Sequence, residues 1–315
     1  ISAKYDEDKD NLYTFYNDNG YKDFKILGDS VYTISENRVG LAIKIDEGDQ
    51  YFIRDIKWIG NSVYRADDLN RILNIEKGSV YNMSHFDDRL NGASGAQVAV
   101  STLYQDHGYL FSRLIPVEAK VEDDSVDIEV RIYEGDQAYL NNIVITGNTR
   151  TNEHIARREL YTLPGELFSK SDILRSMRQL GVIGHFDPEK ISPNVVPDMA
   201  NGTVDLHYKL EERANDQFEI SGGWGAGMLV GSVGVHFNNF SMRNFLNLKE
   251  WRPYPSGDGQ SLSIRAQSNG RLYQSYNISF MEPWLGGNKP NSFSVSVYRA
   301  LMTNGRKRSD SNFQS

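Results

Sequence analysis

Three stretches in the first two thirds of the chain alternate strictly between apolar and polar residues. Alternation with a period of two is typical of a β-strand in a sheet that has one covered face and one face in water. We expect helices to cover the apolar face of each sheet. The apolar members are Val39, Leu41, Ile43 and Ile45 in the first stretch, Val126, Ile128, Val130 and Ile132 in the second, and Val204, Leu206, Tyr208 and Leu210 in the third.

The sequence around these strands repeats itself. Glu47-Gly48-Asp49-Gln50 recurs as residues 134–137, Gly60-Asn61 as residues 147–148, and residues 78–82 as residues 165–169. Each offset is 87 residues (134 − 47, 147 − 60 and 165 − 78). Three matches in one register indicate a tandem repeat.

Each repeat is predicted to have the order β-α-α-β-β. Its first strand stops at the Gly-Asn turn signal, and a short helix follows. Asn82 in one copy and Ser169 in the next then form the N-cap of a second helix. The alternating stretch is the closing strand, so residues 1–47 correspond to the back half of an earlier repeat.

The strand before each closing strand contains proline, with Pro116 in one repeat and Pro193 and Pro197 in the next. Proline has no N–H to donate to a ladder, so within sheets it belongs on edge strands. An open edge can accept an extended peptide through main-chain hydrogen bonds, although each edge could equally be inert. The stretch 21–33 has no proline and is predicted to be the most receptive. The candidate edge residues are Phe24, Lys25, Ile26 and Leu27 in the first copy and Phe111, Arg113, Leu114 and Ile115 in the second, within stretch 110–121.

The composition changes near Arg213. Residues 1–213 contain 24 Lys and Arg against 36 Asp and Glu, whereas residues 214–315 contain 10 against 6. In this last third, strands without intervening helices alternate over roughly ten residues each, the first at about 218–226, and Asn269-Gly270 is a type I′ hairpin signal. This pattern is typical of a transmembrane β-barrel, although a soluble sandwich alternates too. About five strands fit, fewer than the roughly 8 of the smallest membrane barrels, so we expect a piece of a larger barrel or a soluble sheet.

Charge and motif content argue against several classes of function. The net charge of −8 and pI of about 5.3 disfavour a nucleic-acid partner. The chain has no cysteine, and its six histidines include no His-Glu-x-x-His pair. It also lacks a phosphate-binding loop and a Gly-x-Ser-x-Gly elbow. We therefore predict no enzyme activity, no metal and no cofactor.

Tandem units that run into a strand-only segment resemble the BamA family of outer-membrane β-barrel assembly factors. The most specific marks are the two Gly-Asn pairs, the segment 180–186 (Leu-Gly-Val-Ile-Gly-His-Phe) and the segment 279–287, where Glu282, Pro283 and Trp284 are similar to the motif that ends the fourth barrel strand. The resemblance implies an α+β fold of tandem polypeptide-transport-associated (POTRA) domains followed by the first strands of a transmembrane antiparallel barrel. The expected domains are the end of a POTRA domain at 1–47, POTRA domains at 48–137 and 138–213, and about five barrel strands at 214–315.

The resemblance also implies a function and partners. Members of the family fold β-barrel proteins and insert them into the Gram-negative outer membrane, with their POTRA domains in the periplasm and without ATP or covalent chemistry. The implied partners are unfolded outer-membrane protein clients, accessory assembly lipoproteins at the POTRA domains, and outer-membrane lipid. A related polypeptide-translocating pore that secretes a passenger protein, or a soluble scaffold of repeats plus a β-sandwich, remain alternatives.

In this family the first barrel strand forms a weak seam, at which a client strand can pair. The candidate client-binding residues here are Phe218, Glu219, Ile220, Ser221, Gly222, Gly223 and Trp224. Glycine weakens the hold of a strand on its neighbour, so the glycines at 222, 223, 225 and 227 favour a labile edge. The alternative is that they only relieve crowding between closely curved strands.

Overall fold

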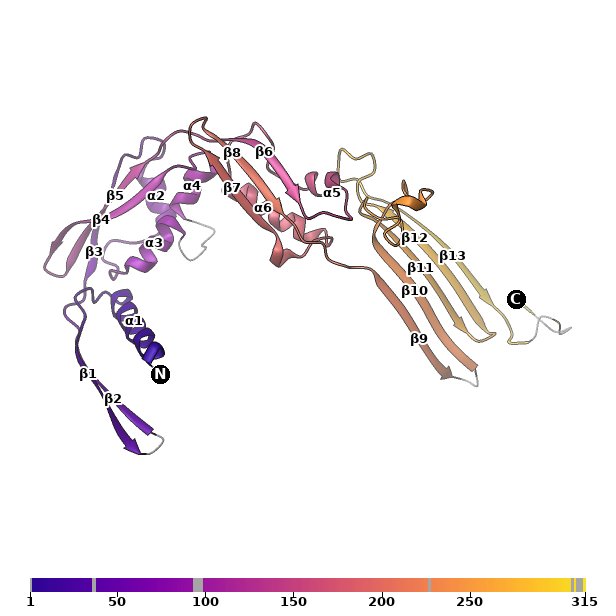
Figure 1. Cartoon of the computed structure of the whole chain (residues 1–315), viewed down its shortest axis with the longest axis horizontal. Coiled ribbons are helices and arrows are strands. Elements are labelled where there is room, and N and C mark those ends of the chain that lie inside the picture. Colours follow the sequence, from indigo (N-terminus) through magenta and orange to yellow (C-terminus); the bar gives the residue numbers. More distant parts are fainter. Residues whose placement is uncertain (1, 36–37, 93–98, 226–227, 307–308, 310–313) are drawn as a thin grey trace. The chain divides into compact units, whose positions relative to one another are not determined.

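The computed structural model describes residues 2–35, 38–92, 99–225, 228–306, 309 and 314–315 (Figure 1). The chain divides into two compact units, and each is described by itself. The first contains residues 1–140 with two short segments, 165–171 and 199–203, and the second contains the remainder.

In the first unit, a three-stranded sheet carries helices on one face. Its strand order is β3-β5-β4, with β3 parallel and β4 antiparallel to the central β5. The apolar residues of β5 are buried, as the alternation predicts, and they pack with Leu69, Phe86 and Tyr104 from the helices. The elements are β3 (Phe52–Ile59), α2 (Ala66–Leu73), α3 (Met83–Asn91), α4 (Val100–Asp106), β4 (Arg113–Glu122) and β5 (Ser125–Tyr133).

This repeat contains a third helix, α4, whereas the predicted order β-α-α-β-β has two helices. The Asn82 side chain caps α3 by accepting a hydrogen bond from the His85 N–H at 2.7 Å, as predicted. Gly92 then ends α3 with a φ of 71°, a left-handed conformation that favours glycine, and α4 begins only at Val100. Residues 93–98 lie outside the described part of the chain.

The next repeat builds the same sheet, in the order β6-β8-β7, with the alternating strand β8 again at the centre. Val204, Leu206 and Tyr208 of β8 are fully buried. Ser169 directly precedes α6, and Asp106 accepts a hydrogen bond from the Ser171 N–H at 2.7 Å. The elements are β6 (Tyr139–Thr146), α5 (Glu153–Arg157), α6 (Lys170–Val182), the 3₁₀ helix η1 (Pro188–Lys190), β7 (Ser192–Asp198) and β8 (Thr203–Lys209).

The repeated Gly-Asn turn needs glycine because two backbone segments approach each other closely there. A Cβ atom on Gly60 would lie 2.2 Å from the Ile132 carbonyl oxygen, and one on Gly147 would lie 1.9 Å from that of Leu210. Both glycines also have φ near +90°. The following asparagine closes the turn, since the Asn148 side chain donates to the Thr151 carbonyl at 3.1 Å.

A carboxylate at the end of each closing strand completes this turn. Glu212 accepts hydrogen bonds from the N–H groups of Arg150 and Thr151, at 2.9 and 2.6 Å. Burial disfavours the charged form of Glu212, but these bonds and those of the threonine hydroxyls outweigh it and hold the pKa below its usual value. Glu134 binds Ser62 and the Val63 N–H in the same way in the preceding repeat.

The first elements are a helix and a two-stranded hairpin, namely α1 (Ser2–Asp18), β1 (Lys25–Ser35) and β2 (Arg38–Asp46). The prediction that helices cover the apolar face of β2 is wrong for the first part of the strand, because Val39 and Leu41 are 69% and 48% exposed. Helix α1 reaches this hairpin at Asp29, which accepts hydrogen bonds from Tyr5 and Lys9.

Within the second unit, the last third forms a five-stranded antiparallel meander in the order β13-β12-β11-β10-β9. The Asn269-Gly270 turn occurs as a three-residue loop before Tyr273, and only Gly270 has a positive φ. The type I′ prediction is therefore wrong, because that turn needs positive φ at two consecutive residues. The strands are β9 (Gln217–Gly225), β10 (Met228–Phe240), β11 (Gln260–Asn269), β12 (Tyr273–Glu282) and β13 (Phe293–Met302), with the 3₁₀ turn η2 (Leu248–Glu250) between β10 and β11. Among the described helices, none is both long and apolar enough to cross a membrane.

The Gly-Asn geometry predicts a large penalty for Gly147→Ala. The left-handed backbone costs alanine about 1–2 kcal/mol, and overlap with the Leu210 carbonyl adds about 1–3 kcal/mol. Gly165→Ala is the matched control, because Gly165 has a φ of 88° with open space around it. Native-state hydrogen exchange of the β8 amides should show a clearly larger loss of stability for Gly147→Ala. Equal losses for the two variants would contradict the close approach.

Candidate functional site

β9 forms one edge of the five-stranded sheet. It pairs with β10 from Gln217 opposite His236 to Gly225 opposite Met228. Among the described residues no strand borders its other side. A strand at a sheet edge presents a row of N–H and C=O groups that can pair with another strand. All seven predicted residues, 218–224, lie on this strand and are exposed.

The two faces of β9 differ in chemistry. Phe218, Ile220 and Trp224 project to one face, and the Trp224 side chain is 76% exposed. On the opposite face, Glu219 accepts a hydrogen bond from the Arg265 guanidinium of β11 at 2.7 Å. The hydroxyl groups of Ser221 and Ser232 lie 2.8 Å apart on the same side. Polar side chains thus help to hold β9 to the sheet from one face only.

Against the described residues, the glycines of β9 relieve no crowding. A Cβ atom on Gly222 or Gly223 would have its nearest neighbour at 4.0 or 3.9 Å, and one on Gly225 would meet nothing within 4 Å. Gly231, opposite Gly222 on β10, is different, because its Cβ would lie 2.8 Å from the Ser221 carbonyl oxygen. The space around the β9 glycines therefore favours the labile-edge interpretation. Residues 226–227 lie outside the described part of the chain.

In the repeats, β4 and β7 each lie at one edge of a three-stranded sheet, with β3 and β6 at the other edges, and both carry the prolines that predicted an edge position. Arg113 and Ile115 of β4 are exposed, whereas Leu114 is buried and faces the core. In the hairpin, Lys25, Ile26 and Leu27 begin β1, where the register shifts between Ile26 and Gly28.

Two predicted edge residues lie outside their strands. Phe24 precedes β1 and is buried, with its ring stacked on Tyr16 at 4.1 Å between centroids. Phe111 precedes β4, in a turn that the Ser112 N–H closes by donating to the Tyr109 carbonyl at 3.2 Å. The assignment of both phenylalanines to edge strands is therefore wrong, because aromatic packing and a turn take them out of the ladder.

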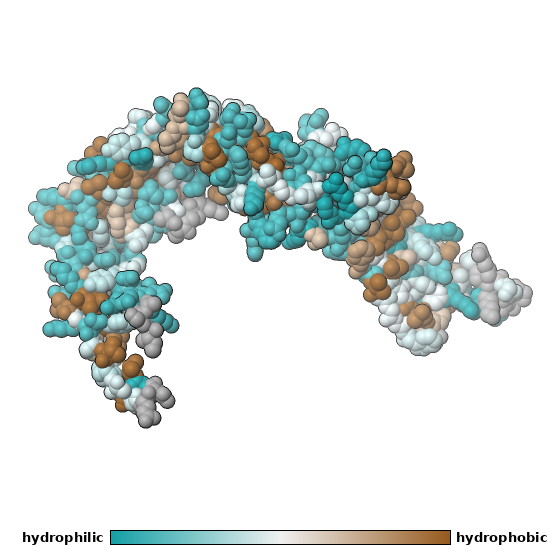
Figure 2. Space-filling model, viewed as in Figure 1, coloured by the Kyte–Doolittle hydropathy of each residue, from teal (hydrophilic) through white to brown (hydrophobic). Residues whose placement is uncertain are grey.

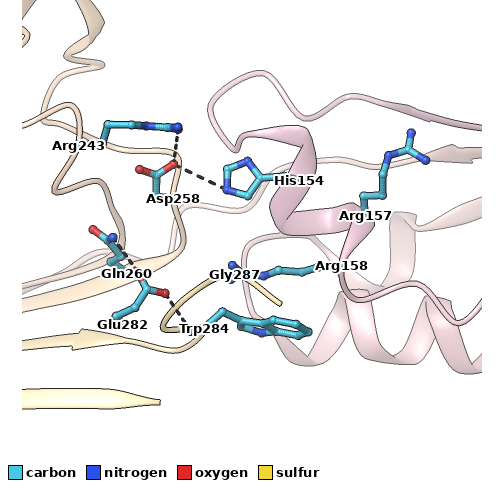
Figure 3. Close-up of a pocket in the computed structure, with 9 residues that line it drawn as sticks. All are labelled: His154, Arg157, Arg158, Arg243, Asp258, Gln260, Glu282, Trp284 and Gly287. Carbon is cyan, nitrogen blue, oxygen red and sulfur yellow. Dashed lines mark hydrogen bonds and ion pairs between the residues drawn. The ribbon is translucent and has the colours of Figure 1, made fainter. Parts of the chain in front are cut away.

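The Glu282-Pro283-Trp284 segment ends β12 and joins the sheet to the α5 region of the second unit (Figure 3). One carboxylate oxygen of Glu282 accepts from the Trp284 N–H at 2.9 Å, and the other accepts from the Gln260 side chain at 2.7 Å. The Arg158 guanidinium lies over the Trp284 ring, 4.9 Å from its centroid. The motif thus fixes an aromatic platform on which an arginine stacks.

A second contact at this end of the sheet centres on Asp258, which sequence reasoning missed. Its carboxylate accepts hydrogen bonds from Asn152 at 2.7 Å, Ser241 at 2.6 Å and Arg243 at 2.9 Å. Figure 3 shows both Arg243 and His154 directed at its carboxylate. Asp258 lies among prolines and glycines in the β10–β11 connection. This composition predicts a loop, but it does not predict which side chains bind Asp258.

A cavity of about 640 Å³ adjoins the contact between Arg158 and Trp284, and both residues line it together with Glu159 and His185. Burial, and secondarily the charge of Arg158, lower the pKa of His185 to about 4, so His185 is neutral at neutral pH. Within the described part of the chain, no group of three or more His, Asp or Glu residues is placed to hold a metal ion. The contacts of Asp258 and Trp284 therefore suit a rigid junction between the sheet and the α5 region.

Comparisons with known proteins agree with this architecture. The family model described as "POTRA: Surface antigen variable number repeat" matches residues 51–135 and 138–213. A putative outer membrane protein assembly factor of Treponema pallidum is 27% identical over 89% of this chain and 32% of its own length. The outer membrane protein assembly factor BamA of Neisseria meningitidis serogroup B is 28% identical over 89% of this chain and 33% of its own length.

A solved structure shares the fold. The crystal structure of BamA from Haemophilus ducreyi lacking POTRA domains 1–3 has a TM-score of 0.60 and 21% identity, and the match covers 82% of this chain and 44% of that one. The present chain spans about a third of the length of the curated relatives it matches. The α+β fold of POTRA repeats followed by an unclosed antiparallel sheet is thereby confirmed.

The space around Gly222 predicts that Gly222→Val strengthens the pairing of β9 with β10. β-Branched residues stabilise strands over glycine by up to about 1 kcal/mol, or roughly fivefold in an equilibrium constant. Amide exchange along β9 should therefore slow by up to that factor. Gly231→Val is the control and should speed exchange, because its side chain overlaps the Ser221 carbonyl. Faster exchange in Gly222→Val would contradict the labile-edge interpretation.

Proposed function

We propose that this chain, which belongs to the POTRA family, is part of an outer-membrane assembly factor that folds β-barrel proteins and inserts them into the membrane. The observation that carries the proposal is the exposed, glycine-rich edge strand β9 beside an apolar sheet face. The names of its curated relatives as assembly factors support it. We further propose the division into domains at 1–47, 48–137, 138–213 and 214–315.

The apolar face of the sheet supports a position in lipid. The strand register places the apolar side chains of all five strands on one face of the sheet. The opposite face carries mainly serine, glycine, asparagine and charged residues. Strands of 9–13 residues suit a hydrocarbon core about 30 Å thick. This exposed face favours a barrel piece over a soluble sandwich. Its members include Phe218, Ile220, Trp224, Leu229, Val233, Val235, Leu262, Ile264, Ile278, Phe280, Val295 and Val297.

The energetics of β9 suit reversible strand exchange. Each backbone hydrogen bond contributes about 0.5–1.5 kcal/mol net. Glycine in a strand costs about 0.5–1 kcal/mol relative to alanine, so the glycines at 222, 223 and 225 together cost about 1.5–3 kcal/mol. That cost cancels the contribution of two or more ladder bonds. A client strand with better β-propensity can therefore pair at this edge and later leave it.

In the proposed mechanism, an unfolded client adds a strand to β9 through main-chain hydrogen bonds. Residues 218–224 supply the backbone groups that receive the client strand. Their apolar face selects the register in which the apolar side chains of the client strand also face lipid. The edges of β1 and β4, with Lys25, Ile26 and Leu27 or Arg113, Leu114 and Ile115, hold clients in the periplasm. Accessory lipoproteins dock on the POTRA domains. The work is done by pairing and burial, without a cofactor or a covalent step, so we propose that the protein is not an enzyme.

Disulfide crosslinking tests this function. The chain contains no cysteine, so Ser221→Cys places a single thiol on the polar face of β9. A client with a cysteine scanned along its strands should crosslink to Ser221→Cys at alternating positions, because side chains on one face recur every second residue.

Ser279→Cys is the matched control on β12, which has β11 on one side and β13 on the other. This variant should give no client crosslink. Equal crosslinking at both positions, or none at Ser221→Cys with an actively assembling client, would refute strand addition at β9.

A further inference from the structure

We propose that the first part of the connection between β10 and β11, residues 241–251, is a membrane-interface anchor that lies among lipid headgroups and the upper part of the acyl chains. The inference rests on the proposed function, because it takes the apolar face of the sheet to be in lipid. It adds a second lipid contact, made by a connecting segment and not by a strand.

The segment exposes an unusual amount of apolar surface. Leu246 is 90% exposed and Leu248 is 73% exposed, and Met242, Phe245 and Trp251 are also exposed. These five large apolar side chains fall within ten residues of sequence. Exposed apolar patches of this kind mark interaction sites with protein or membrane. Figure 2 shows hydrophobic residues at the end of the sheet where the orange helical turn η2 lies in Figure 1.

Register places the segment on the lipid-facing side of the sheet. Phe280 lies on the apolar face opposite Leu262, so Glu282 and Gln260, each two residues farther along, project to that same side. Gln260 accepts a hydrogen bond from the Met242 N–H at 2.6 Å, where the segment begins.

A chain of aromatic rings connects the segment to the apolar face of the strands. The ring centroid of Phe240 lies 6.4 Å from that of Phe280 and 6.3 Å from that of Phe245. Phe240 itself is buried, so the segment packs onto the end of the apolar face through this ring. This packing identifies lipid as the occupant, because a lipid phase that covers the apolar face at Phe280 would also reach the exposed ring of Phe245 beside it.

The segment is held in a defined conformation. The Asn244 N–H donates to the Ser241 hydroxyl at 3.1 Å, and the Trp251 indole N–H donates to the Asn244 carbonyl at 3.2 Å. Its apolar side chains are thus presented on a fixed turn, which lowers the entropy cost of inserting them.

The charges of the segment suit the headgroup region. Arg243 pairs with Asp258 at 2.9 Å, yet its side chain remains 68% exposed and keeps donors for a phosphate. Lys249 adds a second cation beside a single acidic residue, Glu250. Cationic side chains flanking exposed leucine, phenylalanine and tryptophan are typical of interfacial membrane segments.

Depth-dependent fluorescence quenching tests the anchor. A single cysteine is placed at Leu246 in the complete protein, with any cysteine elsewhere in it replaced, and labelled with an environment-sensitive fluorophore. The protein is reconstituted in phosphatidylethanolamine–phosphatidylglycerol vesicles that carry nitroxides at the headgroup, the upper acyl chain or the deep acyl chain. Two reference positions complete the set. Asn288→Cys lies in the β12–β13 connection at the same end of the sheet, and Val297→Cys lies on the apolar face of β13.

The anchor predicts that upper-acyl nitroxides quench the label at Leu246 several-fold more than the label at Asn288, while deep-acyl nitroxides quench the label at Val297. Equal quenching at Leu246 and Asn288, with Val297 quenched, would overturn the anchor and leave the proposed function intact. An unquenched label at Val297 would instead overturn the membrane position of the sheet, on which the proposed function depends.

Discussion

A β-strand at a sheet edge must leave half of its backbone hydrogen-bonding groups without a strand partner, and this constraint organises the function proposed here. β9 is such a strand among the described residues, and its glycines weaken the pairing that it does make. Because the space around Gly222, Gly223 and Gly225 would admit side chains, packing against the described residues does not require glycine there. We therefore propose that weak pairing of β9 with β10 is the property that sets this strand apart.

The rest of the second unit gives this weak edge a rigid setting. Asp258 gathers hydrogen bonds from Asn152, Ser241 and Arg243, and Trp284 supports the Arg158 guanidinium. These contacts lie at the end of the sheet and do not touch the β9 edge. Because the β9 edge and these contacts are separate, β9 can exchange pairing partners while the contacts stay intact. Strand addition needs this separation.

Much of this fold could be predicted because its signals are local. The alternation in 126–132 and 204–210 reports the central strand of each sheet directly, and proline at 116 reports an edge, since each pattern follows from one strand's own geometry. The Gly-Asn repeat predicted a turn, although the reason for glycine, a carbonyl 1.9 Å from a Cβ at Gly147, needed the structure. The placement of Phe24 failed because burial against Tyr16 is a tertiary effect. Asp258 was missed because its partner Asn152 lies 106 residues away in sequence.

The most direct test of the account is hydrogen exchange along β9 in the complete protein, measured with and without a client stalled during assembly. Interior β11 serves as the reference strand. The account predicts fast exchange at β9 in the resting protein and protection of its amides when the client is bound, with β11 unchanged. Exchange at β9 that is as slow as at β11 in the resting protein, or that does not respond to the client, would contradict it.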